Sequence, residues 1–204
     1  MKIVLFDYGA GNLHSLGKAL ERPGDELLIE TDPRRAAAEA DMLVLPGVGA
    51  FGSATARLAP GRDAMRDAIA RGLPTIGICL GMQLLFDGSD EGEGLGLGVI
   101  PGPVTRLRAR RVPQIGWNDV TSAGCDPLFD RAPLPVAYFA NSFVCRPQSE
   151  SCVTAWTTHD GDRFPAAVRV ERTVGVQFHP EKSSADGVRF LHAFVDDARD
   201  GGHR

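Results

Sequence analysis

Several features that define whole classes of proteins are missing from this chain of 204 residues. Only four cysteines occur, and they form neither a C-x-x-C pair nor the dense pattern of a disulfide framework, which fits a reducing compartment. No apolar run is long enough to span a bilayer, and the apolar N-terminal stretch reaches Asp7 too soon for a signal peptide. These absences predict a cytoplasmic protein without a membrane partner.

A concentrated positive charge is also missing. The chain carries 22 Lys and Arg against 26 Asp and Glu, a formal net charge of -4. Nucleic-acid recognition usually needs a basic face, so we expect no nucleic-acid partner.

The order of apolar segments and turns in the first half predicts an α/β fold. Residues 2–6 (KIVLF) form an apolar strand-type run, followed by a turn-rich loop and a helical pattern of leucines. Similar runs at 26–30, 42–45 and 75–78 are each followed by turn or helix signals. This alternation predicts parallel strands in a doubly wound sheet.

After about residue 95 the pattern changes to short β-type runs separated by Pro and Gly, which favours antiparallel pairing. These runs are VTRL (104–107), PVAYFA (135–140), CVTAWTT (152–158), AAVRV (166–170) and VGVQF (174–178). A closing helix is expected over the apolar positions from Val188 to Val195, with Ser184 and Asp186 as candidate caps. Because repeats and long linkers are lacking, residues 1–204 are expected to form one domain.

Cys79 stands in a sequence context that is typical of a nucleophile. It lies between a strand-type run and a helix-like stretch, with Gly77 and Gly81 two residues away on either side, as in a nucleophile elbow. The glycines let the backbone turn sharply, and a following helix N-terminus favours a thiolate and a developing oxyanion. A small buried cysteine at a tight turn is the alternative, and at this point both interpretations stay open.

His179 is the histidine best placed to act as a base. Of the five histidines it alone directly follows an apolar strand-type run, with Pro180 next and Glu181 two residues on. A lone histidine at a strand end is more often an ordinary packed or surface residue, but His-Pro-Glu supplies a base with its own carboxylate. With Cys79 these residues predict a relay for acyl transfer.

Metal and cofactor sites find little support. His179 and Glu181 match the H-x-E half of a zinc deaminase signature, but the P-C-x-x-C half is missing. Gly9 and Gly11 suggest a dinucleotide loop, yet His14 occupies the place of the third glycine. We therefore predict no metal site and no cofactor.

The segment 46–49 (PGVG) follows another strand-type run in the same half of the chain. Loops at the carboxyl ends of parallel strands gather at one edge of the sheet, so its amides could complete an oxyanion hole. Because PG and VG are common turn material, an ordinary turn is the alternative.

Together these motifs resemble the class I (triad) glutamine amidotransferases. The matching stretches are PGVG (46–49), GICLGMQ (77–83) and FHPE (178–181). Within that class, three further stretches resemble the glutaminase subunits of imidazole glycerol phosphate synthase: DYGAGNLHSL (7–16), PQIGWN (113–118) and QFHPEKS (177–183).

The resemblance implies a flavodoxin-like, three-layer α/β sandwich with a mostly parallel central sheet and antiparallel additions in the second half. It also implies hydrolysis of L-glutamine to L-glutamate and ammonia through a cysteine thioester. The expected partner, in a heterodimer, is a TIM-barrel cyclase subunit. That subunit uses the ammonia to make imidazole glycerol phosphate and an aminoimidazole carboxamide ribonucleotide in histidine biosynthesis.

Individual roles follow from the same resemblance. Cys79 is implied as the nucleophile, His179 as the acid/base and Glu181 as its orienting carboxylate. The positions implied to line the glutamine pocket are Gly47, Gln83, Glu91 and Ser142, and the implied oxyanion donors, after a flip of the PGVG peptide, are Gly49 and Leu80. The positions implied to face the cyclase are Asn12, Trp117, Tyr138 and Lys182, for which ordinary packing is the alternative.

The sequence departs from the family pattern at three positions. Gln114 stands where the PHxGWN motif has His, and Asn141 and Phe143 replace the His and Tyr of a typical HSY stretch. These changes leave the triad intact but put in doubt details of glutamine binding and of signalling from the partner.

Three alternatives to this function remain. One is the glutaminase subunit of another synthase, such as those of anthranilate, guanylate or pyridoxal phosphate synthesis, which DYGAGN and GWN disfavour. The second is a catalytically silent regulatory scaffold, which the complete triad disfavours. The third is a cysteine peptidase or a stress protein with the same elbow, which FHPEKS disfavours.

Overall fold

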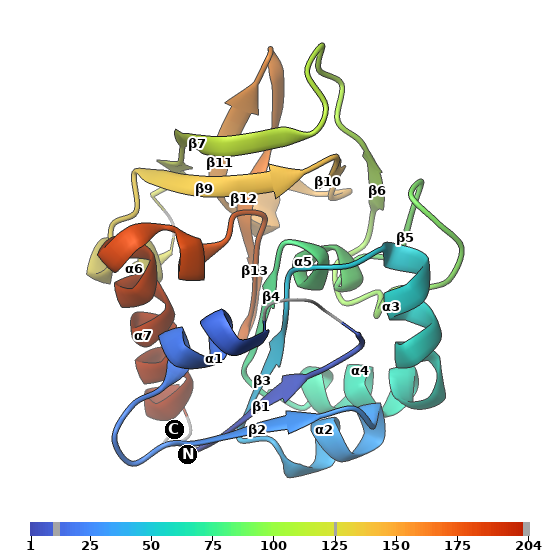
Figure 1. Ribbon diagram of the computed structural model, residues 1–204, viewed down its shortest axis with the longest axis vertical. Helices are drawn as coiled ribbons and strands as arrows, with labels where there is room; N and C mark the ends of the chain where they lie inside the picture. The colour runs from blue at the N-terminus through green and yellow to red at the C-terminus, as the bar shows by residue number, and fades with distance from the viewer. Residues whose placement is uncertain (10–12, 125, 202–204) are drawn as a thin grey trace.

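The strand-type runs of the first half form neighbouring parallel strands in the computed structural model, which describes residues 1–9, 13–124 and 126–201. The parallel strands are β1 (Lys2–Phe6), β2 (Glu26–Glu30), β3 (Met42–Leu45), β4 (Thr75–Ile78) and β13 (Thr173–Val176). They lie in one eight-stranded sheet with the order β2-β1-β3-β4-β13-β12-β11-β8 (Figure 1). The central strands β3, β4 and β13 are buried throughout, which explains why their sequences are apolar apart from the first residue of β4 and β13, a threonine in each.

The second half adds antiparallel strands, as predicted, except that the run 174–178 gives β13, which is parallel to β4 and antiparallel only to β12. β12 (Asp162–Val170), β11 (Val153–His159) and β8 (Thr121–Ser122) extend the central sheet in antiparallel pairing. Two smaller sheets accompany it. They join β7 (Gln114–Asp119) to β9 (Val136–Asn141), and β10 (Phe143–Cys145) to β6 (Pro103–Arg106) and β5 (Gly88–Ser89).

Helices cover both faces of the central sheet. The helices are α1 (Leu13–Leu20), α2 (Pro33–Glu39), α3 (Phe51–Leu58), α4 (Arg62–Ala70), α5 (Leu80–Leu84), α6 (Pro127–Arg131) and α7 (Ser184–Asp200), with 3-10 turns η1 (Ala59–Gly61), η2 (Glu150–Cys152) and η3 (Pro180–Lys182). The core is accordingly divided in two. Ile3 and Leu5 of β1 pack in the cluster that contains α1 and α7, whereas Val4 and Phe6 pack with α3 and α5. The three-layer α/β prediction is confirmed.

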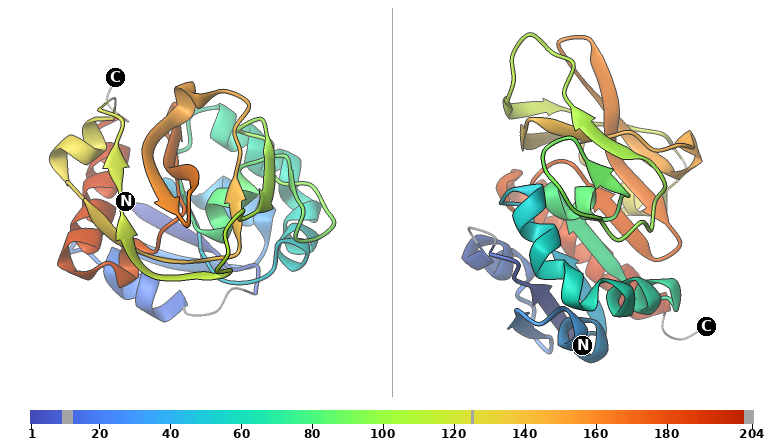
Figure 2. Two further views of the ribbon diagram at one scale, coloured as in Figure 1. Left: turned by 90° about the horizontal axis from the view of Figure 1, so that it is seen from above. Right: turned by 90° about the vertical axis from the view of Figure 1, so that its right-hand side faces the viewer.

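The N-terminus and the end of α7 lie at the bottom of Figure 1, and the small sheet of β7 and β9 lies at the top. The right-hand view in Figure 2, which keeps the vertical axis of Figure 1, shows the same separation. None of the helices in the described ranges combines the length and the apolar character that a membrane span requires.

The prediction of Ser184 and Asp186 as caps of the last helix was wrong. The N-cap position of α7 is Ser183, and its hydroxyl makes no capping hydrogen bond. Instead this hydroxyl donates to the carbonyl oxygen of His179 at 2.7 Å and accepts from the N–H of Tyr138 at 2.9 Å. The sequence could not reveal this role of Ser183, because a serine that bonds to the backbone of other segments cannot be told from a serine that caps a helix.

Candidate active site

Cys79 lies at a strained turn between β4 and α5. Its φ of 49° and ψ of -103° are unusual for a residue with a side chain. Its N–H donates to the carbonyl oxygen of Val176 at 2.7 Å, which ties the turn to β13. A Cβ on Gly77 would lie 2.5 Å from the carbonyl oxygen of Gly81, and a Cβ on Gly81 would lie 2.0 Å from that of Leu45. The backbone therefore requires both flanking glycines.

His179 and Glu181 follow β13 and lie next to this turn. Nδ1 of His179 is 2.9 Å from Oε1 of Glu181, and the two side chains are only 2% and 5% exposed. The N–H of His179 donates to the carbonyl oxygen of Tyr138 at 2.8 Å. The imidazole is thus fixed from both its ring and its backbone.

The charge state of His179 is set by its two neighbours. Burial disfavours the charged ring, but the hydrogen bond and charge of Cys79, followed by those of Glu181, outweigh burial and raise the pKa of His179 to about 10. The ring therefore holds its proton more strongly than a free imidazole while the sulfur of Cys79 is a thiolate. A proton held next to a sulfur nucleophile is available to a leaving nitrogen.

A cavity of about 280 Å³ lies beside these side chains. Cys79 and His179 line it, together with all six residues predicted to bind substrate or the oxyanion: Gly47, Gly49, Leu80, Gln83, Glu91 and Ser142. The structure thus gathers five separate sequence segments around one cavity. Among the described residues, no group of three or more His, Cys, Asp or Glu side chains is arranged to hold a metal ion.

Backbone contacts fix the polar wall of the cavity. Nε2 of Gln83 donates to the carbonyl oxygen of Phe143 at 3.2 Å, and Oε2 of Glu91 accepts from the N–H of Phe51 at 2.9 Å. Phe51 is the first residue of α3, so the carboxylate of Glu91 lies at the N-terminus of that helix. This contact holds the loop that carries Glu91 against the cavity.

The PGVG loop lies in close contact with the triad. A Cβ on Gly47 would lie 2.9 Å from Cε1 of His179 and 3.2 Å from Cβ of Cys79, so only glycine allows the loop to approach. Gly49 has a φ of 140°, which favours glycine. The amide of Leu80 opens α5, where helical N–H groups have no partner within the helix.

Two polar residues of this region were missed in the sequence. The hydroxyl of Tyr8 donates to the carbonyl oxygen of Pro46, and burial, followed by the charges of Cys79 and Asp7, raises the pKa of Tyr8 well above its usual value. Gln177 is fully buried, and its Nε2 lies 3.6 Å from Sγ of Cys79. Both residues stand inside the family-like motifs, which was the only available signal, because their contacts depend on tertiary proximity.

Two of the departures from the family pattern turn out to be neighbours. Gln114 and Asn141 lie directly opposite each other in the β7–β9 pair, and both are buried. Nδ2 of Asn141 donates to the carbonyl oxygen of Phe143 at 3.2 Å, and Asn141 and Phe143 line the cavity. Both side-chain polar atoms of Gln114 and Oδ1 of Asn141 are without hydrogen-bond partners among the described residues. The three departures thus lie close together, with Asn141 and Phe143 on the cavity wall and Gln114 opposite Asn141 in the strand pair.

The residues predicted to face a partner form an exposed surface next to the cavity. Trp117 and Tyr138 are cross-strand neighbours in edge-to-face contact, with ring centroids 6.2 Å apart, and Trp117 is 56% exposed. Nζ of Lys182 lies 6.0 Å from the Tyr138 ring, and Lys182 also lines the cavity. Asn12 lies outside the described residues.

Comparisons with known proteins agree with this geometry. The family model described as glutamine amidotransferase class-I matches residues 4–198. Subunit HisH of imidazole glycerol phosphate synthase from Gloeothece citriformis is 42% identical over 205 residues, covering 97% of this chain and 96% of that protein. The HisH subunit from Thermus thermophilus is 44% identical over 199 residues, covering 94% of this chain and 95% of that protein.

A crystal structure of a glutamine amidotransferase has the same fold, with a TM-score of 0.74 at 22% identity, covering 97% of this chain and 98% of that one. Since nearly the whole chain is matched at above 40% identity, the relationship extends from the fold to the family. The chain therefore belongs to the class-I glutamine amidotransferase family and, within it, to the HisH subunits of imidazole glycerol phosphate synthase.

Proposed function

We propose that this chain hydrolyses L-glutamine to L-glutamate and ammonia, and delivers the ammonia to the cyclase subunit of an imidazole glycerol phosphate synthase. The observation that carries the proposal is the arrangement of Cys79 and His179 on the wall of a single cavity, with Glu181 hydrogen-bonded to the ring of His179, in a chain of the HisH family. The proposed activity thus combines a hydrolase step in this chain with a lyase step in its partner, and the two serve histidine biosynthesis.

The chemistry begins at the sulfur of Cys79. The thiolate attacks the side-chain amide carbon of glutamine, and the backbone amides of Leu80 and Gly49 stabilise the oxyanion that forms. Protonated His179 gives its proton to the amide nitrogen, the C–N bond breaks, and ammonia leaves. Glu181 holds the ring in place and stabilises its positive charge.

Water completes the cycle. Neutral His179 now takes a proton from a water molecule, which attacks the glutamyl thioester. The C–S bond breaks, glutamate leaves, and the thiolate and the protonated imidazole are restored. Each turnover therefore returns Cys79 and His179 to their starting charges.

The remaining cavity residues are proposed to bind glutamine. Glu91 supplies a carboxylate for the α-ammonium group, and Gln83 and Ser142 supply polar groups beside the amide end. Gly47 keeps the loop close enough for the substrate to be enclosed. The Asn141 and Phe143 wall is the part of the pocket in which this chain differs from the family pattern.

The surface formed by Trp117, Tyr138 and Lys182 is proposed to contact the cyclase, a TIM-barrel subunit, in a heterodimer. Support comes from the exposed ring of Trp117 and from Lys182, which lies both at this surface and at the cavity. A contact here can therefore affect the site where glutamine reacts. Asn12 is proposed for the same interface on the resemblance alone, and the location of the complex is proposed to be the cytoplasm.

Glutamate release tests this proposal. It would be measured for the chain alone, with the cyclase subunit, and with the cyclase subunit and its nucleotide ligand. We expect weak release alone and strong stimulation in the full complex, because an enzyme that passes on ammonia gains from gating its release. If the rate of glutamate release is the same with and without this cyclase, the chain would be assigned to another synthase. An absence of release from any mixture would favour the silent scaffold.

A further inference from the structure

The register of two parallel strands brings Gln177 to the catalytic turn. β4 and β13 pair so that their last residues lie opposite each other, and the N–H of Cys79 donates to the carbonyl oxygen of Val176 at 2.7 Å. The next residue, Gln177, is fixed by its own N–H, which donates to the carbonyl oxygen of Ala166 at 2.9 Å. Since side chains alternate along an extended chain, Gln177 and His179 project to the same side.

Three groups contact the sulfur of Cys79. Nε2 of Gln177 lies 3.6 Å from Sγ, the carbonyl oxygen of Ala140 lies 3.9 Å from it, and the ring of His179 is a hydrogen-bond partner. A thiol can donate its proton to the Ala140 carbonyl, but a thiolate cannot and is repelled by that oxygen. Gln177 contributes an N–H that does not titrate, so this donor faces the sulfur while His179 gains and loses its proton.

Fold stability does not explain a glutamine at this position. The side chain is 0% exposed, and its Oε1 is without a hydrogen-bond partner in the part of the chain that the structure describes. A buried acceptor without a partner destabilises a fold, whereas an apolar side chain of equal length would fill the same space without that cost. The group that gains from glutamine here is the sulfur.

We propose that Gln177 is a positioning residue for the Cys79 nucleophile, whose side-chain N–H holds the sulfur toward the cavity and stabilises its anionic form. The contact acts twice in a turnover. It favours the thiolate before attack, and it favours the thiolate again as the leaving group of thioester hydrolysis. Its role in turnover rests on the proposed glutaminase function, but its effect on the sulfur is a property of the chain alone.

The test is the pH dependence of Cys79 alkylation by iodoacetamide in the full chain, without substrate or partner. Modification is followed by mass spectrometry of the peptide that contains Cys79, because Cys145 and Cys152 also carry free thiols. Gln177→Met removes the N–H at nearly constant side-chain length. We expect the midpoint of the alkylation profile to rise by about one pH unit, as for the loss of one hydrogen bond to a charged group.

A second variant separates electrostatics from packing. Gln177→Glu has almost the same shape, but places a carboxylate beside the sulfur, so its midpoint should rise further than that of Gln177→Met. If Gln177 had only a structural role, the alkylation midpoint of Gln177→Glu would not be expected to exceed that of Gln177→Met. If Gln177→Met does not fold, Gln177→Glu carries the test by itself.

The matched control is Gln83→Met. Gln83 is another buried amide next to the cavity, but its Nε2 contacts the carbonyl oxygen of Phe143 instead of the sulfur. Its alkylation midpoint should equal that of the wild type, while its KM for glutamine rises. Wild-type midpoints in the Gln177 variants would overturn the inference, even if their stability or turnover falls. A wild-type complex that releases no glutamate would instead contradict the proposed function and leave the alkylation result standing.

Discussion

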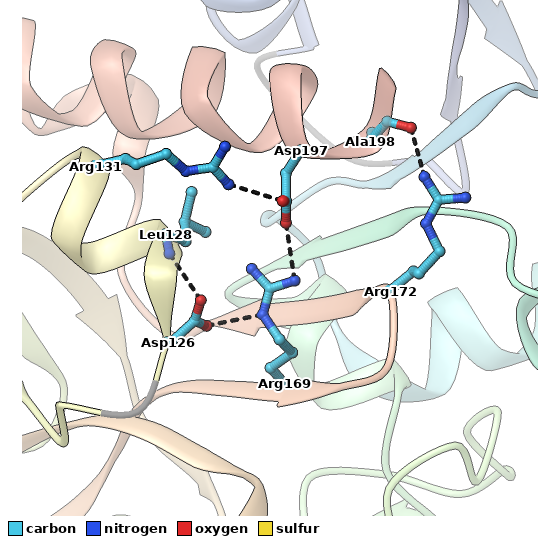
Figure 3. Close-up of polar contacts among 7 residues, drawn as sticks. All are labelled: Asp126, Leu128, Arg131, Arg169, Arg172, Asp197 and Ala198. Atoms are coloured by element: carbon cyan, nitrogen blue, oxygen red, sulfur yellow. Dashed lines mark hydrogen bonds and ion pairs between the residues drawn. The ribbon is translucent and has the colours of Figure 1, made fainter. Parts of the chain in front are cut away.

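Two polar clusters lie near opposite ends of β13, and they are built differently. The distal cluster, shown in Figure 3, joins Asp126, Arg131, Arg169 and Asp197. All four carboxylate oxygens accept a hydrogen bond, including one from the N–H of Leu128 to Asp126 at 2.9 Å. Of the buried side-chain atoms of this cluster, only Nη2 of Arg169 is without a partner among the described residues. This cluster ties α6 and α7 to β12.

The proposed catalytic cluster, which comprises Cys79, Asn141, Gln177, His179 and Glu181, leaves more buried groups unpartnered. Oε2 of Glu181, Oε1 of Gln177 and Oδ1 of Asn141 are buried and have no hydrogen-bond partner in the described residues. Cys79 also holds a strained backbone conformation. One cluster is therefore arranged for stability, and the other has the features of the proposed reactive site, since unsatisfied groups and strain are tolerated at functional sites. Substitutions in the two clusters should therefore affect different measurements.

Cys79→Ala should have the largest effect. Removing the nucleophile should lower glutamine-dependent turnover of the complex by about 10⁴-fold or more. Synthesis from added ammonium salt should persist, because the partner carries out that reaction. The free energy of unfolding should not fall, since a strained site loses only one buried sulfur. Loss of the ammonium-dependent activity as well would point to a structural role for Cys79.

Arg169→Leu should lower stability and leave activity unchanged, which is the reverse of Cys79→Ala. Asp126 is 1% exposed on its side chain, so removing its partner leaves a buried charge and should cost about 3 kcal/mol of unfolding free energy. At temperatures well below the unfolding transition, kcat/KM for glutamine should stay the same. Denaturant titration and steady-state kinetics would measure the two quantities.

Arg131→Leu is the control for that prediction. Arg131 binds the same Asp197 but is 42% exposed, so its loss should cost less than about 1 kcal/mol. Equal losses for the two variants would contradict the distinction between buried and exposed partners.

Glu181→Gln should act through the pKa of His179. Without the carboxylate the raised pKa of about 10 should fall, so the high-pH limb of the kcat/KM profile moves to lower pH and turnover drops by about 10²-fold. The raised pKa of His179 also makes the stability of the fold depend on pH. A raised pKa stabilises the fold fully below the unfolded value of about 6.5, and this contribution is lost as the pH rises through about 10. If the high-pH limb of the kcat/KM profile does not move, Glu181 does not control the pKa of His179.

Tyr8→Phe should give the smallest effect. The variant keeps the ring, which packs edge-to-face on Phe6, but loses the hydrogen bond to the carbonyl oxygen of Pro46. The PGVG loop should then be held less firmly, lowering kcat by about 10-fold with little change in KM, at a stability cost of about 1 kcal/mol. If kcat is unchanged, the hydroxyl serves only to satisfy a buried carbonyl.

The elbow shows how much of the site could be predicted. Gly77, Cys79 and Gly81 form a local pattern, and its sequence alone indicated the close approaches that the structure contains. The partners Gln177 and Cys79 are 98 positions apart, so their contact depends on the register of β4 and β13, which no local pattern specifies. The pairing of Gln114 with Asn141 also depends on strand register, so the sequence alone could not predict it.

The fold was predicted best where local signals were strong. The apolar runs of β1, β3 and β4 identified the parallel strands because burial on both faces leaves continuous apolar sequence. Helices α3 and α4 were not anticipated, since neither follows a recognised strand-to-helix motif. The distal cluster of Asp126, Arg169 and Asp197 was also missed, because charged residues on separate elements carry no sign of their pairing. The single domain over residues 1–204 stays a prediction.

The most direct test of the catalytic claim is to trap the thioester. The complex with its cyclase and nucleotide would be mixed with glutamine, quenched in acid within one turnover, and digested for mass spectrometry. We expect a glutamyl group on the peptide that contains Cys79, and none in His179→Ala or without glutamine. Glutamate formed at an undiminished rate with no adduct at Cys79 at any quench time, and with the same rate in Cys79→Ala, would contradict it.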